Sequence, residues 1–391
     1  MLDFQYQNAT QIVFGEKSQK AVGKMMRGLG NKVLLHYGGG SIKVSGLYQE
    51  IVALLEKEGL EVIPFGGVVP NPRLSLVEEG IDLCNKEGID CILAVGGGSV
   101  IDSAKAIGIG VKSSYPVWDF FTYKKTPREM LPLGVVLTIP AAGSETSMFS
   151  VITKEDGWIK RGVGASCMRP VFACMNPRHT MTLPNYQTAC GASDMLAHVM
   201  ERYFSHTKDI TLGDSLCEAT MKSIIDLSLK VIHHPQEYGP RAELMWAGTM
   251  AHNGILDLGR ATDWASHGIE HELSAIYDIA HGAGLSIIFP AWMRYVAQYP
   301  ANHAKLFDFA TKVLGIEPNL DDLPQTIERG VKALETFYQA IDLPIRLREV
   351  DVLERDIPLM AQKATQEDTI TLGGFQILRA KDVESIYRLA W

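Results

Sequence analysis

The chain lacks the features that mark membrane proteins and secreted proteins. No apolar run approaches the roughly 18 residues that a membrane span needs, and the N-terminus, MLDFQYQNATQIVFGEKSQK, has no basic start followed by an apolar stretch. The six cysteines form no C-x-x-C pair and mostly lie among apolar neighbours. We therefore expect reduced, buried thiols in a cytoplasmic protein without a membrane partner.

The chain also lacks a block of Lys and Arg, and its net charge is -8. This acidic balance argues against nucleic acid as a partner and favours a small-molecule substrate. The composition, with 46% hydrophobic and 21% charged residues, is that of a globular protein. At 391 residues the chain exceeds the usual size of one hydrophobic core, so two domains are expected.

Short apolar runs alternate with helical patterns in the first third of the chain. Four runs have the length and composition of strands, and glycine turns follow two of them. These predicted strands are 32–37, 60–65, 91–95 and 133–139. Helical patterns follow the first at the GGGS turn and run to about Glu58, and follow the second over about 73–86. This alternation predicts an α/β domain whose parallel sheet is buried on both faces.

The second half of the chain has helical spacing throughout and almost no strand-like runs. Pro184 and Asn185 interrupt the pattern where the two styles meet. We therefore predict an α/β domain over residues 1–183 and an all-helical domain over residues 184–391.

A triple glycine lies between a predicted strand and a predicted helix, at Gly96, Gly97 and Gly98. Glycines allow close approach of the backbone to a ligand, and Ser99 would cap the helix, whose free N–H groups attract phosphate. The stretch lacks the GxGxxG pattern, so a tight turn without a ligand is the alternative. The strand–turn–helix setting favours phosphate binding.

The turn after the first predicted strand, HYGGGSIKVSG, contains no acidic residue. In many NAD-binding folds an acid in this region takes the ribose 2′-hydroxyl. Its absence here leaves room for the 2′-phosphate of NADP, with Gly38 and Gly39 in the turn, Ser41 as a donor and Lys43 as a counter-charge. A turn without a ligand is again the alternative.

The stretch CGASDMLAHVMERY, residues 190–203, has helical spacing and places Asp194 and His198 on one face. Such a pair is compatible with a solvated ion pair or with half of a metal site. Downstream, His267, His271 and His281 fall within fifteen residues, and His281 precedes glycines where a helix is expected to end. One carboxylate with imidazoles suits zinc or ferrous iron.

At these residues the chain resembles the iron-activated, group III alcohol dehydrogenases. The resemblance rests on Asp194-x-x-x-His198 with His267 and His281, and on GGGSVIDSAKAIG, which is similar to the pyrophosphate loop of that family. It extends over essentially the whole chain and is greatest to the NADPH-dependent butanol dehydrogenase and aldehyde reductase branch. Many members of the family carry Asp after the first strand and use NAD, whereas Gly38 and Gly39 match the branch that uses NADP.

The resemblance implies a dehydroquinate synthase-like fold with a dinucleotide-binding N-terminal domain, a helical metal-binding domain and a cleft between them. It implies one divalent metal, iron or zinc, on Asp194, His198, His267 and His281, with His271 near the nicotinamide as a candidate proton relay. It also implies a homodimer. The residues that fall where the family contacts NADP(H) are Gly38, Gly39, Ser41, Asn71, Gly97, Gly98, Ser99, Asp102, Thr138, Ser147 and Lys160.

The resulting hypothesis is an NADP(H)-dependent alcohol dehydrogenase or aldehyde reductase that acts on small aldehydes and primary alcohols such as butanal and butanol. An NAD-linked polyol dehydrogenase of the same fold, of the glycerol or propanediol type, is one alternative. A dehydroquinate synthase is disfavoured by the metal motif and by the full-length resemblance. A metal- or nucleotide-binding regulator would need a DNA-binding or partner module, which the sequence does not indicate.

Overall fold

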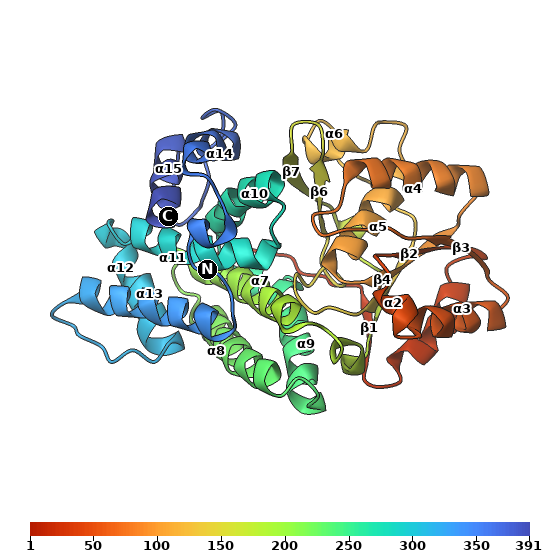
Figure 1. The fold of residues 1–391 in the computed structure, drawn as a ribbon, viewed down its shortest axis with the longest axis horizontal. Coiled ribbons are helices and arrows are strands. Elements are labelled where there is room, and N and C mark those ends of the chain that lie inside the picture. The colour runs from red at the N-terminus through yellow and green to blue at the C-terminus, as the bar shows by residue number, and fades with distance from the viewer. The chain divides into compact units, whose positions relative to one another are not determined.

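A computed structural model describes residues 1–391, the whole of the sequence. The chain forms two compact units (Figure 1), which we call the sheet unit and the helical unit. The sheet unit contains Gln7–Leu183 and Gln236–Thr249, and the helical unit contains Met1–Tyr6, Pro184–Pro235 and Met250–Trp391. A single cut between residues 183 and 184 therefore separates most of the two units, whereas residues 1–6 and 236–249 each belong to the unit on the other side of it.

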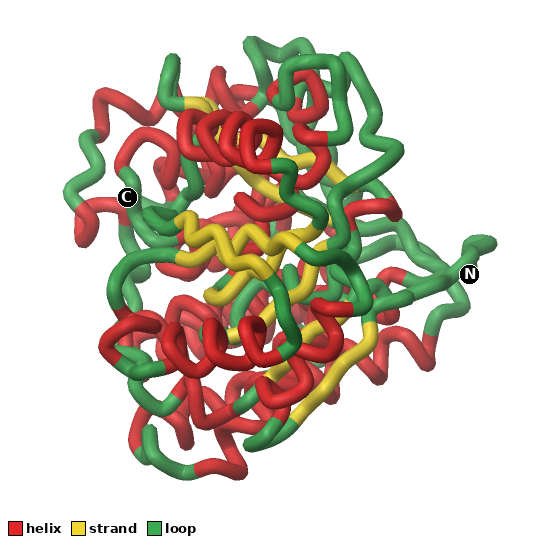
Figure 2. Tube along the Cα trace, turned by 90° about the vertical axis from the view of Figure 1, so that its right-hand side faces the viewer, coloured by secondary structure: helices red, strands yellow, loops and turns green.

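The sheet unit is built on six strands that all pair in parallel, in the order β1-β8-β5-β4-β2-β3. These strands are β1 (Gln11–Phe14), β2 (Lys32–Tyr37), β3 (Glu61–Phe65), β4 (Cys91–Gly96), β5 (Leu133–Leu137) and β8 (Phe172–Met175). Figure 2 shows helices on both sides of the strands. The predicted α/β domain with a parallel sheet is therefore confirmed.

Alternate residues along each central strand face the two sides of the sheet. On β2, Leu34 joins the core formed with α4, α5 and α6, whereas Val33 and Leu35 join the core formed with α1, α2 and α3. Because both faces are covered, the central strands carry apolar residues on both sides, as expected for a parallel sheet. These helices are α1 (Val22–Arg27), α2 (Ser41–Val44), α3 (Leu47–Lys57), α4 (Leu74–Glu87), α5 (Gly98–Val111) and α6 (Trp118–Phe121).

Three features of the sheet unit differ from the sequence-based expectation. The helix expected after the first glycine turn is broken at Gly46, whose φ of 80° is left-handed and ends α2 before α3 begins. An antiparallel hairpin of β6 (Phe149–Lys154) and β7 (Ile159–Gly164), which the sequence did not predict, follows β5. Strands β1 and β8 were not predicted, because four residues are too few for a periodic pattern.

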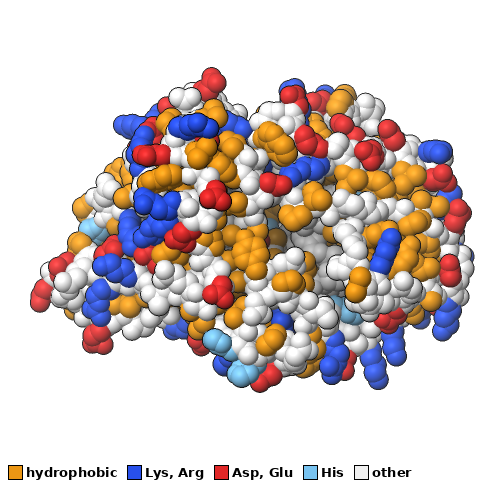
Figure 3. All heavy atoms as spheres, viewed as in Figure 1, with side chains coloured by type: hydrophobic (Ala, Val, Ile, Leu, Met, Phe, Trp, Pro, Cys, Tyr) orange, Lys and Arg blue, Asp and Glu red, His pale blue; other side chains and the backbone are white.

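The helical unit contains no extended sheet, in agreement with the predicted all-helical domain. Its helices are α7 (Asn185–Tyr203), α8 (Thr211–His233), the end of α9 (Tyr238–His252), α10 (Ala265–Tyr277), α11 (His281–Val296), α12 (His303–Asp308), α13 (Leu323–Ala340), α14 (Ile357–Ala364) and α15 (Ala380–Leu389). No helix of the chain is long and apolar enough to cross a bilayer. On the face drawn in Figure 3, basic and acidic side chains are interspersed over the surface.

Candidate functional site

Helix α7 places Asp194 and His198 inside the helical unit. Almost every residue from Thr188 to Tyr203 is buried, so this helix has no solvated face in that stretch. Asp194 is 5% exposed and His198 is 6% exposed. The solvated ion pair is therefore the wrong interpretation of this motif. A buried carboxylate beside a buried imidazole needs compensation from other polar groups or from an ion.

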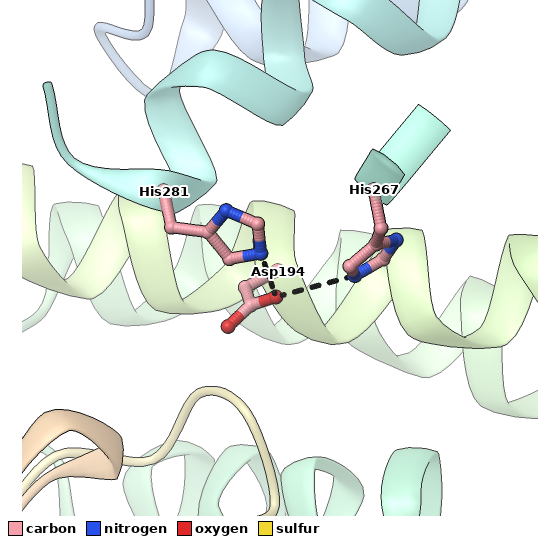
Figure 4. Close-up of side chains that lie close together, drawn as sticks. All are labelled: Asp194, His267 and His281. Carbon is pink, nitrogen blue, oxygen red and sulfur yellow. Dashed lines mark ion pairs between the residues drawn. The ribbon is translucent and has the colours of Figure 1, made fainter. Parts of the chain in front are cut away.

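Two further helices bring histidines to the same carboxylate. His267 lies on α10 and His281 on α11, and their Nε2 atoms are 3.9 Å and 3.8 Å from Oδ1 of Asp194. Figure 4 shows the two rings converging on Asp194 from different helices. The donor atoms of Asp194, His267 and His281 all lie within 4.8 Å of one another, as the ligands of a single ion do.

The close approach of α11 to its neighbours depends on two glycines. A Cβ on Gly282 would lie 1.9 Å from the backbone oxygen of Cys190 on α7. A Cβ on Gly284 would lie 2.4 Å from Oε1 of Glu270 on α10. The structure corrects one detail here, because His281 is the first residue of α11 and no helix ends at it. These glycines let His281 reach Asp194 from the start of a helix.

His198 borders the three-residue cluster and is not part of it. Its Nδ1 donates to the backbone oxygen of Asp194 at 2.9 Å and lies 3.2 Å from Oδ1 of the same residue. Its ring centroid is 4.7 Å from that of His267. Because a carbonyl oxygen only accepts, this bond assigns the proton to Nδ1 and leaves the lone pair on Nε2. His198 thus remains a predicted ligand.

The cluster has the polarity that a divalent cation needs. Oδ1 of Asp194 and Nε2 of His267 are buried and have no hydrogen-bond partner. Burial opposes ionisation of Asp194, but His198, His281 and His267 outweigh it and lower the pKa of this carboxyl. Burial, followed by His198 and His281, holds the pKa of His267 far below its usual value, so the imidazole is neutral. A carboxylate with several imidazoles fits zinc or ferrous iron.

Sequence reasoning missed two carboxylates that contact the cluster. Glu201 on α7 accepts from Nδ1 of His267 at 2.9 Å, and Glu270 on α10 bonds to Nδ1 of His281. Their spacing offered a signal, since Glu201 follows Asp194 by two helical turns and Glu270 directly precedes His271. His271 itself is half-buried on α10, and its ring centroid is 5.5 Å from that of His281.

In the sheet unit, the triple glycine forms the predicted turn between β4 and α5, but Ser99 does not cap the helix. Gly97 is the N-cap, Gly98 begins α5 and Ser99 lies within its first turn. A Cβ on Gly97 would lie 3.0 Å from Ile139, so packing alone disfavours a side chain there. The first-turn N–H groups of a 14-residue helix nonetheless offer a site for phosphate oxygens.

Several residues that were predicted to contact the cofactor form hydrogen bonds to other residues of the sheet unit. Asp102 accepts from Oγ of Ser144 at 2.6 Å and from the backbone N–H of Val151 at 2.9 Å. The backbone oxygen of Ser147 accepts from Nζ of buried Lys105 at 3.0 Å. Nζ of Lys160 donates to Oδ1 of Asn71 at 3.0 Å, and both side chains are buried. Thr138 is half-buried at the end of β5.

The turn after β2 is exposed and has room for added atoms. Gly39 and Ser41 are exposed, and a Cβ on Gly39 would meet no atom within 4 Å. The ammonium of Lys43 lies 5.1 Å from the ring centroid of Tyr37 and 5.3 Å from that of Tyr48. These rings therefore hold its charge beside the turn by cation–π attraction.

Comparison with known proteins defines the class. Residues 9–177 match the model of the iron-containing alcohol dehydrogenase family, and residues 188–391 match its C-terminal region. The chain belongs to the iron-containing alcohol dehydrogenase family. It is therefore an alcohol dehydrogenase, and the family implies a nicotinamide cofactor and iron.

Particular relatives carry more specific names. The chain is 39% identical to the probable NADH-dependent butanol dehydrogenase 1 of Bacillus subtilis, over 99% of both chains. It is 31% identical to the NADPH-dependent aldehyde reductase YqhD of Escherichia coli, over 95% of both. A crystal structure of NADH-dependent butanol dehydrogenase A from Thermotoga maritima superposes with a TM-score of 0.95, at 38% identity, over 100% of this chain and 99% of that one.

Proposed function

We propose that this protein is a metal-dependent alcohol dehydrogenase and aldehyde reductase that uses NADP(H) on small aldehydes and primary alcohols such as butanal and butanol. The single observation that carries the proposal is the buried cluster of Asp194, His267 and His281, in which two polar atoms have no hydrogen-bond partner. The substrate class is supported by the names of relatives that match this chain over nearly its whole length.

Asp194, His267 and His281 would hold one iron or zinc ion, with His198 as the fourth ligand. When bound, such an ion supplies a Lewis acid for a carbonyl or alkoxide oxygen. Asp194 contributes the negative charge, and the imidazoles contribute Nε2 lone pairs. His271 would line the substrate position and pass a proton to or from it. The first turn of α5, with Gly97 and Gly98, would bind the pyrophosphate and so hold the nicotinamide.

The turn at Gly38, Gly39 and Ser41 supports NADP(H). It has no carboxylate to repel a 2′-phosphate, and the nearby ammonium of Lys43 favours one. Asn71, Asp102, Thr138, Ser147 and Lys160 would shape the rest of the cofactor site, Asp102 and Ser147 by holding its loop through the bonds described above. NADH is the second candidate, because butanol dehydrogenases at 36% to 39% identity carry NADH in their names.

The test is turnover with purified protein that has been loaded with Fe²⁺ or with Zn²⁺. We expect loss of absorbance at 340 nm with butanal, a higher kcat/KM for NADPH than for NADH, and no turnover after chelation. Glycerol and 1,2-propanediol serve as comparison substrates with NAD. If these polyols exceed butanol in kcat/KM, the polyol dehydrogenase becomes the better assignment. Binding of metal and nucleotide without turnover of any alcohol or aldehyde would overturn the proposal.

A further inference from the structure

The rings of His267 and His281 are held in the same way. In each ring Nε2 faces Oδ1 of Asp194, at 3.9 Å for His267 and 3.8 Å for His281. In each ring Nδ1 meets a glutamate carboxylate, which is Glu201 for His267 and Glu270 for His281. The nitrogens that face away from Asp194 in Figure 4 are those that meet these two carboxylates. Both glutamates are fully buried.

This arrangement decides which nitrogen can bind a cation. A carboxylate accepts hydrogen bonds, so the bond assigns a proton to Nδ1 of each ring, and in the tautomer that binds a metal the lone pair is then on Nε2. We infer that Glu201 and Glu270 are positioning residues that hold His267 and His281 in the orientation and tautomer required for metal binding. The inference rests on the proposed metal-dependent function, because it deepens the role of the same cluster.

Glu201 connects α7 to the start of α10 through hydrogen bonds. Its Oε1 also accepts the backbone N–H of His267 at 3.0 Å, and its Oε2 accepts that of Trp264 at 2.7 Å. Trp264 is the residue before α10 and has a left-handed φ of 67°. One carboxylate on α7 therefore fixes both the start of α10 and the ring that α10 carries. The backbone bonds alone would make it a helix cap, whereas the bond to Nδ1 extends its role to the metal cluster.

Glu270 acts from the other side of the cluster. It lies three residues after His267 on α10, and its carboxylate occupies the space left beside Gly284 on α11. The side chain of Glu270 therefore links α10 to the first residue of α11 through Nδ1 of His281. His198 differs from both histidines, because its Nδ1 donates to a backbone oxygen. The inference thus assigns side-chain support to two of the three histidines.

The test measures metal affinity without cofactor or substrate. Apo protein is titrated with Co²⁺ against a chelator of known affinity, for the unaltered chain and for Glu201→Gln, Glu201→Met, Glu270→Gln and Glu270→Met. Glu272→Met is the matched control, because Glu272 is fully buried on α10 and its carboxylate is 3.6 Å from Nζ of Lys363. The thermal unfolding midpoint of each apo protein is measured in parallel, since a purely structural role changes only that quantity.

We expect the Met variants to bind Co²⁺ about 10- to 100-fold more weakly than the control, as loss of a partner that orients a ligand does. The Gln variants keep an acceptor oxygen without the charge and are expected to fall between. If Glu201→Met does not fold, Glu201→Gln and the Glu270 pair decide the question. Affinities within twofold of Glu272→Met, with lowered apo midpoints, would reduce both glutamates to structural residues and overturn the inference.

Failure of the proposed function has a different signature. If the unaltered chain takes up no Co²⁺, both the metal-dependent function and this inference are wrong. If the unaltered chain binds one Co²⁺ per chain and the glutamate variants match the control, the metal site remains and only the positioning role is lost.

Discussion

Helices α5 and α7 are both deeply buried and both carry charged side chains, but the hydrogen bonding of those side chains differs. On α5, Nζ of Lys105 donates to the backbone oxygens of Ser144, Ser147 and Phe149, at 2.7 Å, 3.0 Å and 2.8 Å. On α7, Oδ1 of Asp194 has no hydrogen-bond partner. Complete pairing rigidifies a scaffold, whereas an incompletely paired buried anion indicates that something else completes the site.

The pKa shifts of buried groups on the two helices show the same contrast. Burial lowers the pKa of Lys105 to about 8, and the charges of Asp102 and Glu145 oppose the shift, so most of its charge is retained at neutral pH. Burial raises the pKa of Glu201 to about 7, against the backbone N–H groups of His267 and Trp264 that lower it. The sheet unit neutralises its buried lysine with local oxygens. In the helical unit, the buried acids and imidazoles around Asp194 leave Oδ1 of Asp194 and Nε2 of His267 without a hydrogen-bond partner.

Loss of a ligand is expected to have the largest effect. His267→Ala and His198→Ala remove a predicted donor from the cluster, and we expect each to lose the metal and with it nearly all activity. The expected loss of affinity exceeds the ~10- to 100-fold typical of residues that only orient ligands. Metal content by mass spectrometry and far-UV circular dichroism provide the check. A His198→Ala protein that keeps one metal per chain and full activity would limit the ligands to the other three residues.

Replacing His271 is expected to lower turnover and leave the metal in place. His271 borders His281 and lies outside the cluster of Asp194, His267 and His281. A positioned acid–base group contributes about 10²- to 10⁴-fold, so His271→Gln is expected to reduce kcat by at least about 100-fold. Steady-state kinetics and metal content are measured together. Loss of metal would make His271 a ligand, and an unchanged kcat would make it a pocket-lining residue.

His36 tests whether the sheet unit depends on complete pairing. Its ring is buried between the backbone oxygen of Phe65, at 2.8 Å from Nδ1, and Oγ of Ser103, at 2.9 Å from Nε2. Burial lowers its pKa from 6.5 to about 4, against the bond to Phe65 that raises it. The unfolded chain thus binds a proton between about pH 6.5 and pH 4 that the folded chain does not.

The free energy of unfolding should therefore fall as the pH is lowered through that window, by about 3 kcal/mol from this group alone. His36→Gln keeps a donor and an acceptor but does not titrate, so its stability is expected to depend less on pH. Urea denaturation of both proteins at pH 7 and pH 4 measures the difference. If both proteins lost the same free energy of unfolding between pH 7 and pH 4, protonation of His36 would not be the cause of the loss.

The smallest expected effect lies at the turn after β2. Gly39→Asp introduces a carboxylate into open space, at a residue without a positive φ, so the fold is expected to tolerate it. The carboxylate would repel a 2′-phosphate and accept from a 2′-hydroxyl, moving the kcat/KM ratio toward NADH by about tenfold. Gly39→Asn is the uncharged control. An unchanged ratio would separate this turn from cofactor choice.

The sequence was informative wherever a signal was local. Apolar runs predicted β2, β3, β4 and β5, and the i,i+4 spacing placed Asp194 and His198 on one helical face. It misled where an element was short or depended on distant partners. Strands β1 and β8 exist through pairing between residues far apart in the chain, and Ser99 lies inside α5 because Gly97 serves as its N-cap.

The sequence by itself determined the fold class and the family, and it predicted which residues would bind a nicotinamide nucleotide and a metal. Only the tertiary structure decided that Asp194 is buried, that His267 and His281 turn Nε2 toward it, and that Glu201 and Glu270 hold the opposite nitrogens. The physical reason is that hydrogen-bond partners and burial depend on the close approach of α7, α10 and α11. That approach depends on Gly282 and Gly284, whose missing side chains matter only once the helices meet.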